Sequence, residues 1–201
     1  IGQPDFFANK SNQGSETPAA NTLQQPRGVV VYGSKLLIAD GTNHRVLIYN
    51  SIPTSNNASA DVVIGQPSMS TGAINQGNTA TVSSNTLYFP FALTVDSNGR
   101  LYVAEWSNNR VLIYNSIPTT NNASADLVLG QPHLSTNAIN QVGTEVIPSS
   151  RTLSQPQDVL VVGNKLIVSD YGNSRVLIYD QLPTVSNSSA SWVIGQSSMT
   201  G

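Results

Sequence analysis

One segment of the chain occurs three times with few changes, and this repetition constrains the fold more than any other feature. The copies read RVLIYNSIPTSNNASADVVIGQ at 45–66, RVLIYNSIPTTNNASADLVLGQ at 110–131 and RVLIYDQLPTVSNSSASWVIGQ at 175–196. A fixed period predicts one supersecondary unit stacked on copies of itself, because a single unit cannot bury its apolar face alone.

Each repeat contains four short apolar runs separated by Gly, Asn, Ser and Pro. In the first repeat the runs are GVVVY at 28–32, KLLIAD at 35–40, RVLIY at 45–49 and ADVVIG at 60–65. Runs that are apolar at consecutive positions favour strands covered on both faces. Four antiparallel strands linked by hairpins form a propeller blade. The sequence therefore predicts an all-β fold, a β-propeller of four-stranded blades with three blades in this chain.

The turns and connections of the repeats carry a pattern of their own. Asn98-Gly99 is the strongest turn signal, and we expect a type I′ hairpin there because both residues tolerate positive φ. An Asn-Gln pair and a leucine recur in the long connections that precede each blade, which predicts that these connections are ordered and pack onto the blades. The recurring residues are Asn12-Gln13 with Leu23, Asn75-Gln76 with Leu87, and Asn140-Gln141 with Leu153. Each connection is assigned to the blade that follows it, which gives units at 1–66, 67–131 and 132–201.

The segments LLIADGTNHRVLIY, LYVAEWSNNRVLIY and LIVSDYGNSRVLIY resemble the NHL repeat, whose blades open with P-x-G-V-x-V and have a Y-V-A-D-x-x-N-H-R-V core. The chain departs from this pattern at Glu105, which replaces the usual Asp, and at Asn109 and Ser174, which replace the motif His. Its connections are also long, as in similar bacterial proteins with NHL repeats. The resemblance implies a propeller of NHL-type blades, of which the family usually has six in a ring.

Three blades do not close a ring, because known propellers have about four to eight blades. Either two chains pair into a six-bladed ring, or these residues are half of a longer array of blades. Ile1-Gly2-Gln3-Pro4 matches the end of a fourth strand and Ile194-Gly195-Gln196 matches it again, as in a segment cut from a tandem array. Head-to-tail polymerisation into a filament is a third alternative. The expected partners are therefore the chain itself or further blades.

Composition narrows the functional classes. Only 10% of the residues are charged and the net charge is −2, whereas soluble domains carry about 25% charged residues. Without a strongly basic face, the chain is not expected to bind nucleic acid, as some NHL domains do. No apolar run reaches the about 18 residues that a membrane span needs, so membrane insertion is not expected. The absence of cysteine excludes disulfides and thiolate catalysis and, with the low charge, favours an extracellular or cell-surface protein.

An acid and an arginine bracket the turn between the second and third runs of every repeat. Active sites are usually asymmetric, whereas this pair recurs in each blade, so we expect a structural role. The acid should accept backbone N–H groups inside the turn, and the arginine should hold the acid in place. The pairs are Asp40 with Arg45, Glu105 with Arg110, and Asp170 with Arg175.

No residue set predicts catalysis or metal binding. The two histidines, His44 and His133, stand at non-equivalent places in their repeats. NHL-like amidating lyases resemble this fold but hold a metal with several converging histidines, which two such residues cannot supply. The sequence contains neither a D-x-D-x-D-G calcium motif nor a G-x-S-x-G elbow. We therefore expect no catalytic residue, no metal and no cofactor.

Two aromatic residues mark a candidate binding face. Trp106 and Tyr171 follow the acid in the polar turn, where Gly41 stands in the first repeat. An exposed aromatic beside Asn-rich connections is typical of contact with a protein or a glycan, although each ring could instead pack under its connection. Their turn neighbours His44, Asn108 and Asn173 complete this candidate face.

Sequons of the form N-x-S recur between the third and fourth runs, at Asn57, Asn122 and Asn187, and another begins at Asn9. We expect the three repeated sequons on the face opposite the long connections. They are either glycosylation sites of a secreted protein or ordinary loop residues.

The leading hypothesis is a non-catalytic extracellular or cell-surface propeller that serves as a scaffold or adhesion module, or binds a protein or glycan. One alternative is a structural subunit of a head-to-tail polymer. Another is part of a six-bladed, lyase-like or lactonase-like enzyme whose site needs residues from other blades.

Overall fold

The computed structural model describes residues 1–79, 81–141 and 147–200, and these form three antiparallel sheets of four strands each. The first blade contains β1 (Pro26–Tyr32), β2 (Lys35–Asp40), β3 (Arg45–Tyr49) and β4 (Val62–Ile64). The middle blade contains β5 (Pro90–Val95), β6 (Leu101–Glu105), β7 (Arg110–Tyr114) and β8 (Leu127–Leu129). The last blade contains β9 (Pro156–Val162), β10 (Lys165–Asp170), β11 (Arg175–Tyr179) and β12 (Trp192–Ile194). The prediction of four-stranded propeller blades is confirmed.

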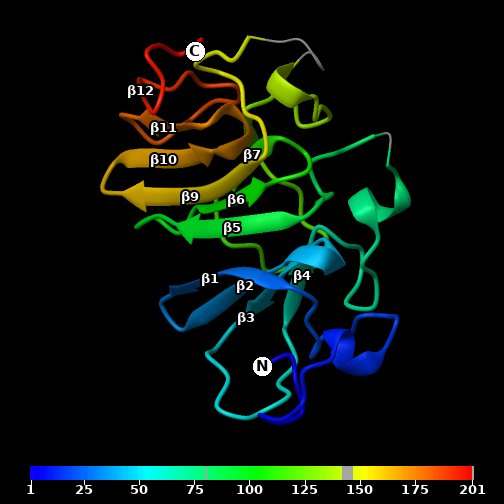
Figure 1. The fold of residues 1–201 in the computed structure, drawn as a ribbon. Coiled ribbons are helices and arrows are strands. Elements are labelled where there is room, and N and C mark those ends of the chain that lie inside the picture. Colours follow the sequence, from blue (N-terminus) through cyan, green and yellow to red (C-terminus); the bar gives the residue numbers. More distant parts are fainter. Residues whose placement is uncertain (80, 142–146, 201) are drawn as a thin grey trace.

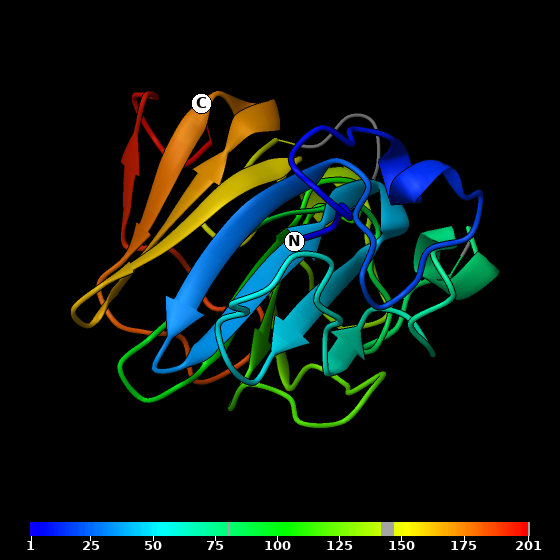
Figure 2. The ribbon, with the colours of Figure 1, turned by 90° about the horizontal axis from the view of Figure 1, so that it is seen from below.

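The blades stack face to face in sequence order, with the middle blade between the other two (Figure 1). The first strands lie innermost, where β1 is beside β5 and β5 is beside β9. Figure 2 shows the same stack from below, with the sheets fanned about their inner strands. This arrangement brings the starts of β1, β5 and β9 together at one end of the stack, and the candidate site lies there.

Three buried apolar clusters explain why the strands read as continuous apolar runs. One lies on the outer face of the first blade, at Leu36, Leu47 and Val63, and the other two lie between blades. Leu37 and Ile48 of the first blade meet Leu101 and Leu112 of the middle blade in one core. The opposite face of the middle blade meets the last blade in the second core, where Tyr102 packs near Leu177. Each strand of the middle blade therefore buries side chains on both of its faces.

The turn at Asn98-Gly99 differs from the expected type I′ hairpin. At Asn98-Gly99 only Gly99 has a positive φ, of 82°, so the expected turn is wrong. Asp96 determines this turn instead, because its Oδ1 accepts the N–H groups of Asn98 at 2.9 Å and Arg100 at 3.0 Å. The side chain of Asp96 thus replaces the second left-handed residue that a type I′ turn requires.

The long connections are ordered where the structure describes them. Each contains a short 3₁₀ turn with an Asn and a Gln at positive φ, as at Asn75 (46°) and Gln76 (59°). Leu87 and Leu153 of these connections are fully buried. Leu87 lies against Gly65 of the first blade and Leu153 lies against Gly130 of the middle blade. These two connections therefore fill the boundary, or seam, between successive blades. The turns are η1 (Ser11–Gly14), η3 (Ile74–Gly77) and η4 (Ile139–Gln141).

Candidate functional site

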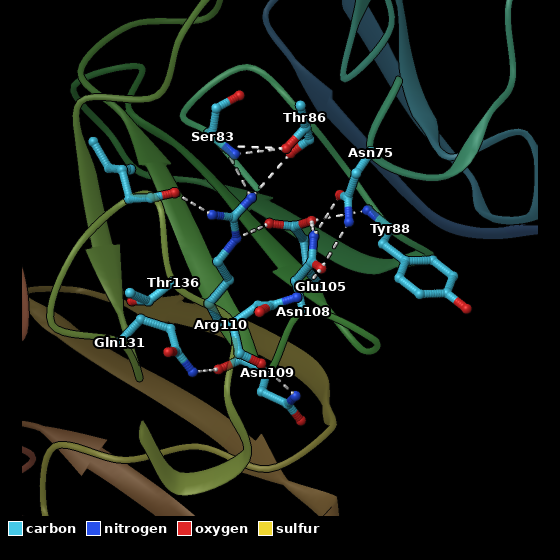
Figure 3. Close-up of polar contacts among 12 residues, drawn as sticks. Asn75, Ser83, Thr86, Tyr88, Glu105, Asn108, Asn109, Arg110, Gln131 and Thr136 are labelled. Carbon is cyan, nitrogen blue, oxygen red and sulfur yellow. Dashed lines mark hydrogen bonds and ion pairs between the residues drawn. The ribbon is translucent and has the colours of Figure 1, made fainter. Parts of the chain in front are cut away.

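A buried ion pair closes the turn between the second and third strands of each blade. In the middle blade, Arg110 Nε lies 2.5 Å from Glu105 Oε2 (Figure 3). The corresponding distances are 2.8 Å for Arg45 with Asp40 and 2.7 Å for Arg175 with Asp170. All six side chains are buried. A buried pair of this kind needs further hydrogen bonds to offset its desolvation.

Those hydrogen bonds come from the connections on both sides of the blade. Arg110 donates to the carbonyl oxygens of Ser83 at 3.1 Å, Thr86 at 3.0 Å and Leu134 at 2.6 Å. Ser83 and Thr86 precede the blade in the chain, whereas Leu134 follows it. Each arginine therefore fastens two connections to its own blade, since Arg45 and Arg175 make the corresponding bonds.

The acid accepts its backbone donor from outside the turn. Glu105 Oε1 accepts the N–H of Tyr88 at 2.9 Å and the side-chain amide of Asn108 at 2.7 Å. The expectation of donors inside the turn is therefore wrong for the backbone, because the donor belongs to the preceding connection. Burial raises the pKa of Asp40 and of Asp170, and the arginine and the N–H donors around each carboxyl act in the opposite direction.

The two asparagines that we placed on the binding face are bonded to asparagines of the long connections; Asn108 is buried and Asn173 is half-buried. Asn108 is fully buried and pairs with Asn75, each donating to the side-chain oxygen of the other at 2.9 and 3.3 Å. Asn173 pairs in the same way with Asn140 of the last connection at 2.8 and 3.0 Å. These asparagines hold the connections in place. Placing Asn108 on the candidate face was wrong, because the sequence did not show that it would be buried against an asparagine partner; the place of half-buried Asn173 on that face stays a prediction.

The repeated sequons lie against the long connections, contrary to our expectation. Gln76 Nε2 donates to Asn122 Oδ1 at 2.6 Å. Gln13 makes the same bond to Asn57 at 2.6 Å, and Gln141 makes it to Asn187 at 2.7 Å. The fourth sequon, at Asn9, is exposed in the first connection. The repeated sequon asparagines thus help to fix the Asn-Gln turns, and their modification stays a prediction.

His44 is a link between blades. It is 8% exposed, and its Nδ1 accepts the N–H of Phe89, the residue before β5, at 3.2 Å. Asn109 takes this place in the middle blade, where its Oδ1 accepts the N–H of Gln155 at 2.9 Å. The motif histidine and the asparagine that replaces it therefore both accept a backbone N–H of the next blade. His44 is buried in this contact and does not belong to the candidate binding face.

Replacing His44 with asparagine should remove part of the acid sensitivity of the protein. Burial lowers the pKa of His44 to about 4, whereas an unfolded histidine has a pKa of about 6.5. The folded chain then binds fewer protons than the unfolded chain between these values, so the histidine makes the free energy of unfolding fall as the pH decreases. Urea unfolding of wild-type protein and His44→Asn at about pH 7 and about pH 4.5 measures this difference. Equal decreases in the two proteins would contradict the role assigned to His44.

An aromatic cluster lies where β1 and β5 begin. The rings of Phe89 and Trp106 are 5.6 Å apart, and those of Phe89 and Phe91 are 6.2 Å apart. The guanidinium of Arg27, on β1, lies 5.4 Å from the Phe89 centroid and 5.0 Å from the Phe91 centroid. Arg27 is exposed and the three rings are half-buried. The cluster therefore offers apolar ring surface together with one accessible positive charge.

This cluster breaks the symmetry of the repeats. The first blade has Gln25, Arg27 and Gly41 at the three ring positions, and the last blade has Gln155, Gln157 and Tyr171. Of the aromatic residues we singled out, Trp106 therefore belongs to a cluster, whereas Tyr171 is 57% exposed on the last blade. Sequence reasoning missed Arg27, Phe89 and Phe91. A comparison of the residues on either side of Pro26, Pro90 and Pro156 would have found them.

The described residues show no grouping of three or more His, Cys, Asp or Glu side chains that could hold a metal ion. Among the same residues, no helix has the length and apolar character that a membrane crossing requires. The acids identified from the sequence are all engaged in the ion pairs described above. Of the described residues considered above, those of the aromatic cluster and the exposed Tyr171 remain available to a ligand.

The stacked four-stranded sheets make this chain three blades of a β-propeller. The family model described as NHL repeat matches residues 87–114, which run from the end of the second connection through β7. This match confirms the resemblance for the middle blade.

No curated protein sequence matches the chain. Among solved structures, glutaminyl cyclase from Myxococcus xanthus is similar with a TM-score of 0.46 and 10% identity, over 86% of this chain and 53% of that one. A chain of a nidogen/laminin complex is similar with a TM-score of 0.43 and 16% identity, over 88% of this chain and 54% of that one. The chain thus spans about half the length of these two proteins.

Proposed function

We propose that this chain is a non-catalytic binding module that takes a protein or glycan ligand at the cluster of Arg27, Phe89, Phe91 and Trp106. One observation carries the proposal. The repeats are alike in the ion pairs and asparagine pairs that hold the fold, but they differ at this end of the inner strands, where the middle blade alone has three rings. Residues needed only for folding should be alike in all three blades.

The chemistry of the cluster defines the ligand class. Half-buried rings bind the apolar face of a sugar ring or an apolar side chain, and such aromatic anchors carry much of the energy of many interfaces. Arg27 is held over two rings and is exposed. A carboxylate is the preferred partner of such a guanidinium. The ligand therefore combines an apolar ring or side chain with an acidic group.

The proposal includes an extracellular or cell-surface location, where the module serves as a scaffold or in adhesion. The low share of charged residues and the absence of cysteine support this location. Proteins outside the cell meet acidic glycans and peptides, which fit the arginine of the cluster.

A single-tryptophan protein tests the proposal. The chain has two tryptophans, and Trp192→Phe leaves Trp106 as the only one. The probes are neutral oligosaccharides, oligosaccharides that contain uronic acid, and peptides with an aromatic residue beside an acidic one. We expect an acidic probe to change the fluorescence of Trp106 in a saturable manner. Absence of any saturable change across all three probe classes would contradict the proposal.

Phe91→Gln introduces the residue that stands at the equivalent position of the last blade, Gln157. This change should weaken binding of the acidic probe at least about tenfold, or 1.4 kcal/mol. The change removes ring surface and the contact of Arg27 at 5.0 Å. Because Phe91 is only half-buried, the melting temperature should change little. Unchanged affinity in a folded variant would show that the cluster only packs the blade.

A further inference from the structure

The aromatic cluster spans the seam between the first and middle blades. Arg27 comes from β1, whereas the two rings under its guanidinium, Phe89 and Phe91, come from the middle blade. The inner strands approach closely here, since a Cβ on Gly28 would lie 2.9 Å from Ala92 Cα. The position of the guanidinium over the rings therefore depends on how this end of the seam is held together.

Phe89 is held by a hydrogen bond on each side of its backbone. Its N–H donates to Nδ1 of His44, in the first blade, at 3.2 Å, and its carbonyl oxygen accepts the Trp106 N–H at 3.2 Å. Phe89 has a φ of 54°, in the left-handed region that a bulky residue rarely adopts. The equivalent Gln25 and Gln155 share this conformation, with φ of 50° and 51°, so it belongs to the repeat. The bond to His44 then fixes Phe89 relative to the first blade.

The corresponding bond in the other seam does not depend on a titratable group. Asn109 Oδ1 accepts the N–H of Gln155 there at 2.9 Å, and an amide does not ionise in water. His44 accepts at Nδ1 only as a neutral imidazole with its proton on Nε2. Protonation of Nδ1 would put a second donor against the Phe89 N–H, so the hydrogen bond would be lost. The titratable acceptor therefore lies in the seam that contains the aromatic cluster.

The surroundings of His44 do not favour a charged imidazole. The Tyr88 ring packs edge-on against it, with the ring centroids 5.3 Å apart. Gln66, whose amide donates to the His44 carbonyl oxygen, belongs to a connection with no ionisable side chain at 65–77. The charged and titratable groups at this end of the seam are Tyr88, Arg27 and the ion pairs of Asp40 with Arg45 and Glu105 with Arg110. Both carboxylates already have an arginine partner, so neither is free to stabilise an imidazolium.

We propose that protonation of His44 releases the ligand from the aromatic cluster, so that acid switches the binding site off. This inference rests on the proposed function and adds its regulation. With neutral His44, Phe89 is bonded to the first blade and its ring lies under Arg27. When His44 takes up a proton, the bond to Phe89 is lost and this end of the seam opens. The rings and the guanidinium then no longer form one surface.

The direction of the effect follows from the protons bound in each form. Burial lowers the pKa of His44 to about 4 in the closed seam, whereas a solvated histidine has a pKa of about 6.5. Between these values the open form binds more protons than the closed form, so a decrease in pH favours opening. The ligand binds the closed form, and its affinity therefore falls over the same range.

The single-tryptophan protein tests the proposal, because Trp106 reports on the cluster. The affinity of the acidic probe is measured at about pH 7 and about pH 4.5 for Trp192→Phe, alone and combined with His44→Asn. Titration of the probe's own carboxylate affects both proteins equally. We expect the ratio of the two affinities to be at least about fivefold larger without His44→Asn than with it. His133→Asn, at the second and exposed histidine, is the matched control and should leave this ratio unchanged.

A second measurement needs no ligand. The emission of Trp106 is followed from about pH 7 to about pH 4.5 in the same proteins, while far-ultraviolet circular dichroism confirms that each is folded. We expect His44→Asn to reduce the change in emission, because its amide keeps the bond to Phe89 as Asn109 does in the other seam. His44→Gln supplies a second amide acceptor and should act in the same direction.

The outcomes separate this inference from the proposed function. Saturable binding at about pH 7 with equal affinity ratios in the proteins with and without His44→Asn would overturn the switch and leave the proposed function standing. An emission change that persists in full in both amide variants would also overturn the switch alone. Absence of saturable binding in every protein would contradict the proposed function, and the inference that rests on it.

Discussion

Replacing Arg110 with alanine is expected to lower the free energy of unfolding by about 3–5 kcal/mol, because the change leaves a buried carboxylate without its partner. Arg110 also donates to three backbone carbonyl oxygens that hold two connections, and these oxygens lose their donor as well. A loss of this size is a large part of the about 5–15 kcal/mol that stabilises a typical domain. Urea unfolding at one protein concentration measures it.

The repeats supply a matched control for this prediction. Asp stands at the place of Glu105 in the first and last blades, where it pairs with arginine at 2.8 and 2.7 Å. Glu105→Asp keeps the charge pair, so its cost should stay below about 1 kcal/mol. If Arg110→Ala lowered the free energy of unfolding no more than Glu105→Asp, the ion pair would not stabilise the blade as the structure indicates.

Replacing Gly130 with alanine should cost about 3 kcal/mol, because strain and overcrowding act at the same place. Gly130 has a φ of +83°, and its new Cβ would lie 2.6 Å from Leu153 Cδ1. Leu153 is fully buried between the middle and last blades and cannot move aside without opening the seam. Thermal or urea unfolding of Gly130→Ala checks this cost.

The double variant separates crowding from backbone strain. Leu153→Ala alone should cost about 2–5 kcal/mol, since it leaves a cavity in the seam. In Gly130→Ala with Leu153→Ala the new methyl group no longer meets the leucine, so the combined loss should be smaller than the sum by about 1–3 kcal/mol. If the two losses were strictly additive, the cost of Gly130→Ala would come only from the positive φ of residue 130, and the close contact between residue 130 and Leu153 would not contribute.

The architecture was predictable because it depends on features that recur. The 65-residue spacing of the arginines and the runs at consecutive apolar positions define stacked four-stranded blades. The turn at Asn98-Gly99 was mispredicted because only these two residues were considered, whereas Asp96, two residues earlier, stabilises another conformation through two side-chain hydrogen bonds. The buried asparagine pairs were also missed. Each joins residues about 30 positions apart, and no local signal reveals such a partner.

The candidate site was only partly predictable. Trp106 was visible as an aromatic residue in a polar turn, whereas Phe89 and Phe91 read as ordinary residues at the start of a strand. Their neighbour Arg27 comes from the preceding blade. Only the stacking of β1 beside β5 brings the arginine over the rings. A site assembled from two repeats is difficult to read from either repeat alone.

The most direct test of the proposed binding site is a crystal structure of the chain with the acidic probe that gives the strongest fluorescence change. The account predicts that the probe lies against Phe91 and Trp106 with its carboxylate at Arg27. A probe bound elsewhere on the chain, with the cluster free, would contradict it.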